Sequence, residues 1–180
     1  MRRREVITLA ASAAAWPFAV RAQSGKMPTI GFLGAATPAA WSEWVVAFSQ
    51  RSRELGWAEG RTVSIEYRWA EGRPDRSAEI AAEFVRLKVD IIFAPVTVTA
   101  VAAKEATSTI PIVFALVGEP VGIGLVASLA RPGGNVTGTS NQSTDLGGKR
   151  LDFVREVVTG LRRFAILVNV GNPANCSREP

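Results

Sequence analysis

The feature that most constrains this chain is a regular alternation of short apolar runs with amphipathic helical segments. Residues 90–94 (DIIFA) are almost wholly apolar, which is typical of a parallel strand covered on both faces. Further strands are expected at 28–34, 63–67, 110–116 and 135–139, with helices at 37–55, 75–87, 98–106 and 124–130 between them. Five strands alternating with helices predict an α/β fold with a Rossmann-like, doubly wound parallel sheet.

Helix-capping and helix-breaking residues mark where the first helices begin and end. Thr37-Pro38 reads as an N-cap followed by proline at the first helical position, Gly56 ends that helix, and Asp75 is a candidate N-cap for the next one. Apolar residues recur at helical spacing in the first helix, and we favour core packing over a binding role for them: Trp41, Trp44, Val45, Phe48 and Leu55.

Composition limits the chemistry of the chain. There is no histidine, so neither a Ser-His-Asp triad nor a histidine-ligated metal site can be built. The only cysteine, Cys176, has no disulfide partner in the chain. Residues 31–34 (GFLG) lack the Gly-x-Gly-x-x-Gly spacing that brings a backbone close to a dinucleotide. We therefore expect no enzyme activity, no cofactor and no metal.

The N-terminus has the pattern of an export signal. Arg2, Arg3 and Arg4 form a positive region, residues 6–20 are mostly apolar, and residues 20–22 (VRA) form a small-residue cleavage site that ends at Ala22. The paired arginines resemble the twin-arginine pattern, and the apolar run is shorter than the ~20 residues of a membrane span. We predict an exported, periplasmic protein that does not span the membrane after cleavage. The alternative is an uncleaved N-terminal anchor.

The net charge gives no support for a nucleic-acid partner. The chain carries 21 basic and 16 acidic residues. Removing residues 1–22 leaves 17 basic and 15 acidic residues, a net charge of about +2 by the same count. The remaining basic residues are scattered along the chain, so binding to DNA, RNA or a membrane surface is not expected.

One stretch carries a family resemblance. Residues 118–121 read GEPV, residues 124–130 read GLVASLA, and residues 131–138 read RPGGNVTG. This string resembles the signature of bacterial ABC-transporter substrate-binding proteins of the tryptophan/tyrosine type, whose members typically carry GDPV, GLVASL and RPGGNVTG in that order. The resemblance implies a two-lobed protein with a type I periplasmic-binding-protein-like fold. Such a protein binds a small-molecule solute between its lobes and delivers it to an ABC permease.

The resemblance also implies a division into domains. Residues 27–142 correspond to the first α/β lobe. Residues 143–180 correspond to the start of a second lobe, with a helix over 146–161, a strand over 164–169 and Asn172-Pro173 after it. Members continue through the rest of the second lobe, so we expect a chain truncated after its first lobe, by a premature stop or frameshift near Asn175.

Candidate ligand-binding residues lie in the loops expected after the strands. In open α/β sheets, ligands bind at the carboxyl ends of the strands, where helix N-termini offer free N–H groups. These loops are residues 34–37, 95–99, 117–120 and 139–142, and the candidates in them are Thr37, Thr97, Thr99, Gly118, Glu119 and Asn141.

Four of the candidates have a simpler alternative. The three threonines either meet a polar ligand end or only cap helices. Thr97 aligns with the threonine of the family's Gly-Gly-Thr stretch, although Pro95 and Val96 replace the two glycines. Glu119 stands where the family has aspartate, and it either binds a ligand amine or caps its own turn.

Three functional classes follow from these observations. The export signal, the fold pattern and the family string favour a solute-binding module. An enzyme on a Rossmann-like fold is less favoured, because no acid–base pair stands out. The third class is a truncated, non-functional remnant of a binding protein.

Overall fold

The computed structural model describes residues 26–141 and 146–167. Its elements follow in chain order: β1 (Thr29–Gly34), the 3-10 helix η1 (Ala39–Trp41), α2 (Ser42–Glu54), β2 (Ser64–Trp69), α3 (Pro74–Leu87), β3 (Ile91–Phe93), α4 (Thr97–Ala106), β4 (Ile112–Val117), β5 (Val136–Ser140) and α5 (Gly147–Val157).

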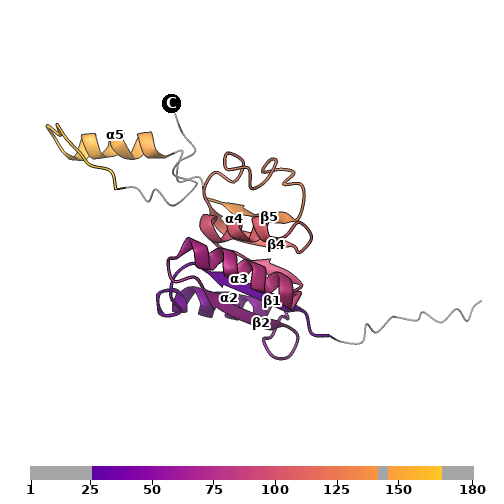
Figure 1. Cartoon of the computed structure of the whole chain (residues 1–180). Coiled ribbons are helices and arrows are strands. Elements are labelled where there is room, and N and C mark those ends of the chain that lie inside the picture. The colour runs from indigo at the N-terminus through magenta and orange to yellow at the C-terminus, as the bar shows by residue number, and fades with distance from the viewer. Residues whose placement is uncertain (1–25, 142–145, 168–180) are drawn as a thin grey trace, which may run out of the picture.

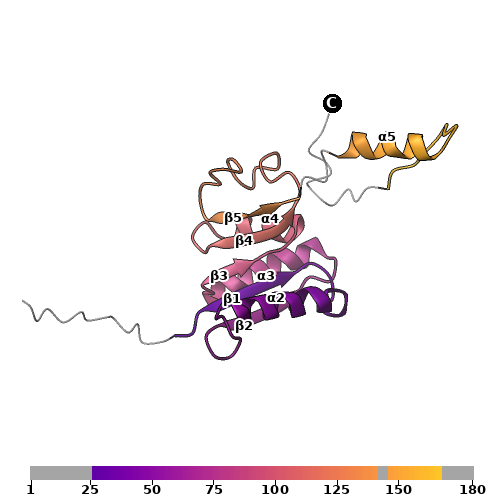
Figure 2. The ribbon, with the colours of Figure 1, turned by 180° about the vertical axis from the view of Figure 1, so that it is seen from behind.

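The five strands form one parallel sheet in the order β2-β1-β3-β4-β5. Within it, β1 is paired on both sides, so that Phe32 lies opposite Tyr67 of β2 and Phe93 of β3. Figures 1 and 2 show α3 and α4 on one face of the sheet and α2 on the other. The predicted α/β class and the doubly wound parallel sheet are therefore confirmed.

Each face of the sheet has its own core. On the α3 and α4 side, Phe84 and Ile92 are fully buried in one continuous apolar cluster. On the α2 side, Phe32 is the centre of an aromatic group in which Phe48 of α2 stacks on Phe93 with ring centroids 5.0 Å apart. Burial of large apolar side chains on both faces is what a parallel sheet requires for stability.

The helix expected at 124–130 does not form. Residues 118–135 connect β4 to β5 through turns, and Gly124 has φ +68°, a left-handed conformation that a right-handed helix does not contain. Two residues of the segment are nevertheless buried as an apolar helix face would be, Leu125 and Val126, whereas Leu129 is exposed. Glycine and proline within the segment thus outweighed its helical spacing of apolar residues.

Helix starts also differ from expectation. Arg73 is the N-cap of α3 and Pro74 is its first residue, so Asp75 lies in the first turn rather than at the cap. After Thr37-Pro38 the chain forms η1 before α2 begins at Ser42. The first helical segment packs Trp41, Val45 and Phe48 on the sheet, while two residues expected in the core are mostly exposed, Trp44 and Leu55.

The helix expected near 146–161 is present as α5, which lies apart from the sheet in both views (Figures 1 and 2). Residues 164–167 do not form the expected strand, and residues 168 and 169 lie outside the described residues. A strand needs a paired neighbour for its backbone hydrogen bonds, and no other strand is described in this part of the chain. Within the described ranges, no helix is long and apolar enough to span a membrane.

Candidate functional site

The carboxyl ends of β3, β4 and β5 bring three loops together. The Leu116 N–H donates to the Pro95 carbonyl at 2.7 Å, which ties the end of β4 to the loop after β3. The Asn141 N–H donates to the Val117 carbonyl at 3.1 Å, which ties the residue after β5 to the end of β4. Because these bonds join backbone to backbone, they fix the relative positions of the loops that hold most of the candidate residues.

The loop after β1 lies at the same edge, because all strands are parallel. It is anchored to the end of β2 instead, where the Gly72 N–H donates to the Ala35 carbonyl at 2.7 Å. Between β1 and β3 the connections leave to opposite faces of the sheet, which makes this the topological switch point where such sheets bind ligands.

Two candidate threonines lie at the start of α4. Thr97 is 5% exposed and Thr99 is fully buried. The Thr99 hydroxyl donates to the Val96 carbonyl at 2.9 Å and accepts the Val96 N–H at 3.4 Å. Thr99 therefore closes the first turn of α4 on its own backbone, which fixes the loop on which Thr97 stands.

Thr37 is exposed in the loop after β1. Its hydroxyl oxygen accepts the Ala40 N–H at 3.3 Å, a local contact that matches the capping interpretation. An exposed hydroxyl at the start of a helical segment still offers a donor to a solute, because it keeps its own proton.

Gly118 and Glu119 form a corner just after β4. Gly118 is buried, and Glu119 has φ +47°, a left-handed conformation that is unusual for a residue other than glycine. The Glu119 carbonyl accepts the Ile123 N–H at 3.0 Å. Its carboxylate lies over its own turn, since Oε2 is 3.6 Å from the position of a Cβ on Gly122. This corner lies beside exposed Asn141, whose N–H bonds to Val117.

Sequence reasoning missed an aromatic wall at the same edge. Trp69 ends β2, and its ring lies 6.4 Å from Trp41 and 5.6 Å from Phe32, centroid to centroid. Both tryptophans are only partly buried. The alternation of Val63, Ile65 and Tyr67 continues to Trp69, so the period-2 pattern could have placed it on the same face of the sheet.

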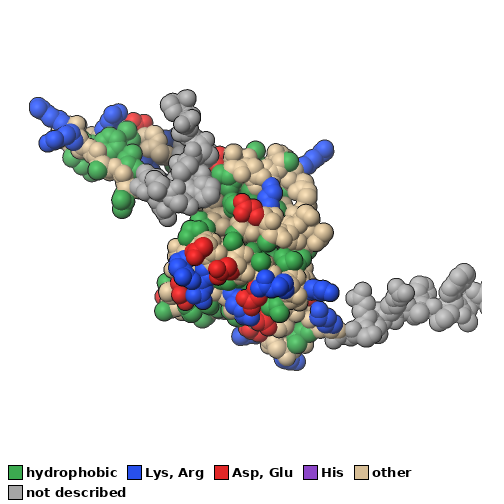
Figure 3. All heavy atoms as spheres, in the orientation of Figure 1, with side chains coloured by type: hydrophobic (Ala, Val, Ile, Leu, Met, Phe, Trp, Pro, Cys, Tyr) green, Lys and Arg blue, Asp and Glu red, His purple; other side chains and the backbone are tan. Residues whose placement is uncertain are grey.

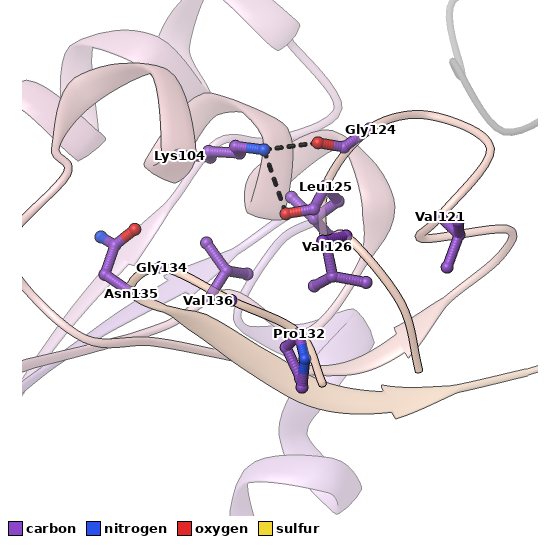
Figure 4. A pocket seen from close by; sticks show the side chains of 11 residues that line it. Lys104, Val121, Gly124, Leu125, Val126, Pro132, Gly134, Asn135 and Val136 are labelled. Atoms are coloured by element: carbon purple, nitrogen blue, oxygen red, sulfur yellow. Dashed lines mark hydrogen bonds between the residues drawn. The ribbon is translucent and has the colours of Figure 1, made fainter. Parts of the chain in front are cut away.

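A separate hollow lies away from this edge, between α4 and the segment that leads into β5 (Figure 4). It has a volume of about 570 Å³, and its lining includes Lys104, Leu125, Val126, Pro132, Asn135 and Val136. The Asn135 amide donates to the carbonyls of Thr107 and Ile110, at 3.1 and 2.7 Å. None of the six candidate residues lines it, so the signature-like string forms this hollow and only its first residues reach the carboxyl edge.

Charged side chains of both signs are intermingled over α3 and β2 (Figure 3). Arg68 pairs with Glu83 at 3.0 Å and with Glu66 at 3.2 Å, and Arg76 pairs with Glu71 at 3.3 Å. These pairs are at least one-third exposed, so each contributes little to stability. Within the described part of the chain, no group of acidic or cysteine residues is arranged to hold a metal ion.

Comparisons with known proteins agree with this fold. The sequence pattern of the family described as ABC transporter substrate binding protein matches residues 40–178. The chain therefore belongs to the ABC transporter substrate-binding protein family.

Individual relatives support the same conclusion. The chain is 36% identical over 123 residues to a tyrosine-binding protein of Clostridioides difficile (strain R20291), across 68% of this chain and 35% of that protein. A conserved domain protein of Vibrio cholerae O1 biovar El Tor has a similar structure, with a TM-score of 0.76 and 30% identity over 84% of this chain and 51% of that one.

A third relative is an ABC domain from Streptococcus pneumoniae whose structure was solved with L-Trp. It has a TM-score of 0.58 and 27% identity, over 63% of this chain and 38% of that one. The chain thus spans between about one third and one half of the length of these relatives.

Proposed function

We propose that this protein is the extracytoplasmic solute-binding component of an ABC importer, which binds a small molecule and delivers it to a membrane permease. The observation that carries the proposal is the joined carboxyl edge of β3, β4 and β5 in a chain of the substrate-binding family. That edge holds Thr97, Gly118, Glu119 and Asn141 on loops fixed by backbone hydrogen bonds.

An aromatic amino acid is the ligand class that these groups suit. Hydroxyls and N–H groups at helix starts, such as those of Thr37 and Thr97, favour a carboxylate. The Glu119 carboxylate favours an ammonium group. The partly buried rings of Trp41 and Trp69 offer an apolar wall for the side chain. Relatives named for tyrosine binding and solved with L-Trp support this choice.

Binding by this lobe alone should be weak. A two-lobed binder closes on its solute and removes water from both sides, and the closed form is the one a permease would recognise. If a second lobe supplies half of the polar contacts, losing about 4 kcal/mol would turn a micromolar site into a roughly millimolar one. We therefore expect the first lobe on its own to bind the solute weakly, and a protein with both lobes to bind it more tightly.

Delivery to a permease requires export, which the N-terminal pattern supports. Residues 1–22 carry the signal, with cleavage after Ala22 and release into the periplasm. These residues lie outside the described part of the structure. We propose that the protein is exported by the twin-arginine route.

The test titrates ligands into the purified mature chain and measures binding by calorimetry and by nuclear magnetic resonance. The panel contains L-tryptophan, L-tyrosine, L-phenylalanine, L-leucine and acetate. We expect saturable, roughly millimolar binding of the aromatic amino acids, weakened by Glu119→Gln and unaffected by Glu105→Gln, a matched change at an exposed site on α4.

A second arm adds a complete second lobe from a close relative to the first lobe. This protein should bind far more tightly, and Thr97→Ala in it should weaken binding again. Sub-micromolar binding by the chain alone would contradict the expectation that the first lobe on its own binds the solute weakly. No binding by the two-lobed protein to any member of the panel would count against an amino-acid ligand.

A further inference from the structure

The connection between β4 and β5 holds part of the candidate site without a helix to support it. Residues 118–135 have no regular helix, so their shape depends on turns and on a few anchored groups. Leu125 and Val126 are 2% and 5% exposed and belong to the core on the α4 side of the sheet. The Glu119 corner is only a few residues before these anchors.

Lys104 is the side chain that reaches this connection from α4. Its ammonium donates to the carbonyl oxygens of Gly124 and of Leu125, the latter at 3.1 Å (Figure 4). No carboxylate among the described residues forms an ion pair with Lys104. Its charge is therefore directed at two adjacent backbone carbonyls, a charge-assisted contact that is stronger than one between neutral groups.

The same two peptides are bonded back to Pro120. The Leu125 and Val126 N–H groups donate to the Pro120 carbonyl at 2.8 and 3.1 Å, and the neighbouring Ile123 N–H donates to the Glu119 carbonyl at 3.0 Å. The ammonium thus binds the carbonyls of two peptides whose N–H groups bind the Pro120 carbonyl, one residue after Glu119. Hydrogen bonds that are linked in series through the same peptides polarise and strengthen one another.

We propose that Lys104 is a positioning residue for solute binding: it locks the turn at 123–125 and thereby fixes the left-handed Glu119 corner at the carboxyl edge. The inference rests on the proposed function, in which Glu119 meets the solute. Lys104 lines a different hollow from the one that the solute would occupy, so it acts through the turn and does not touch the ligand.

The test compares three variants of the full chain. Lys104→Met keeps the apolar stem and removes the donors, Lys104→Arg restores a charged donor, and Glu105→Gln is the control on the neighbouring exposed residue. Amide hydrogen exchange is followed at Ile123 and Leu125, with Ile92 and Ile112 as reference amides in the sheet.

We expect Lys104→Met to speed exchange at Ile123 and Leu125 about tenfold, which corresponds to ~1.4 kcal/mol, with Ile92 and Ile112 unchanged. Lys104→Arg should recover most of the protection. L-tryptophan is the binding probe, and its dissociation constant should rise by a similar factor in Lys104→Met only.

Two outcomes would overturn the proposal. One is unchanged exchange at Ile123 and Leu125 in Lys104→Met. The other is a uniform rise at all four amides, which would show a general loss of stability instead of a local one. If the wild-type chain binds no L-tryptophan, the aromatic amino-acid ligand is contradicted, whereas the exchange measurement still decides whether Lys104 fixes the turn.

Discussion

The indole ring of Trp69 lies against the backbone of Gly34. The two residues are register partners at the ends of β2 and β1, and a Cβ built on Gly34 would lie 2.1 Å from Cε3 of Trp69. Only a glycine leaves room for the ring at this place. The packing directs Trp69 toward Phe32 and Trp41, and so builds the aromatic wall at the carboxyl edge.

Gly34→Ala should destabilise the protein by about 1–3 kcal/mol, because the added methyl group must push the indole out of a packed site. Urea denaturation followed by circular dichroism measures the change in the free energy of unfolding. Gly147→Ala is the matched control, since Gly147 has no heavy atom within 4 Å of its added Cβ. Equal free energies of unfolding for the two variants would show that the packing of Trp69 does not require a glycine at position 34.

Thr99→Val should cost about 1 kcal/mol of stability, because valine keeps the volume but loses the hydroxyl that bonds to the Val96 backbone. Thr99→Ser keeps the hydroxyl and should cost less despite losing a methyl group. The measurement is the free energy of unfolding of both variants. A larger loss for serine than for valine would mean that packing, and not the hydroxyl, matters at this site.

The sheet could be predicted from the sequence because each strand is marked by a local pattern of apolar residues, and such patterns recur along the chain. The run at 90–94 and the alternation from Val63 to Tyr67 each indicate a strand by composition and period, and each appears in the sheet. The segment at 124–130 could not be predicted in this way. Its apolar spacing favoured a helix, whereas the structure has a turn with a left-handed Gly124, which is contacted by Lys104 from twenty residues away.

The candidate site could likewise be predicted only in part from the sequence. The topology rule placed the loops at one edge, and backbone bonds join three of them. The rule gives no side-chain orientation, so it could not reveal that the Thr99 hydroxyl turns back to Val96 or that Trp69 covers Gly34. The Thr99 contact is local and matches the capping alternative, whereas the packing of Trp69 on Gly34 joins two different strands, which a single sequence does not encode as a local pattern.

Limited proteolysis should cut within or near α5 before it attacks the sheet. Phe153, Val157 and Ile166 are 65%, 81% and 74% exposed, so this part of the chain has little packing to protect it. We expect a protease of broad specificity, such as subtilisin, to leave a resistant core spanning about residues 27–139, as judged by mass spectrometry. The exposed apolar side chains should also favour self-association, which light scattering would detect. Protection of a monomer throughout α5 would contradict this prediction.

Expression of the whole coding sequence in a bacterial host should yield an exported protein that begins at Gln23. The expected cause is cleavage after Ala22, at the end of the positive and apolar segments. Replacing Arg3 and Arg4 with lysine should block export if the twin-arginine route is used. N-terminal sequencing of the periplasmic fraction is the measurement. Recovery of a soluble cytoplasmic protein with Met1 intact would rule out both cleavage and export.

Glu119→Gly should raise stability while weakening solute binding. Glu119 has φ +47°, a conformation that glycine adopts without steric cost, so the replacement should stabilise the fold by about 0.5–1 kcal/mol. It also removes the carboxylate that we assign to the ligand ammonium, which should weaken L-tryptophan binding about tenfold or more. Lys88→Gly is the matched control, because Lys88 has φ +53° at the end of α3 and lies outside the candidate site. It should give a similar gain in stability with no change in binding. If both glycine variants bind L-tryptophan as the wild type does, Glu119 has no part in recognising the solute, and its left-handed backbone serves only the turn.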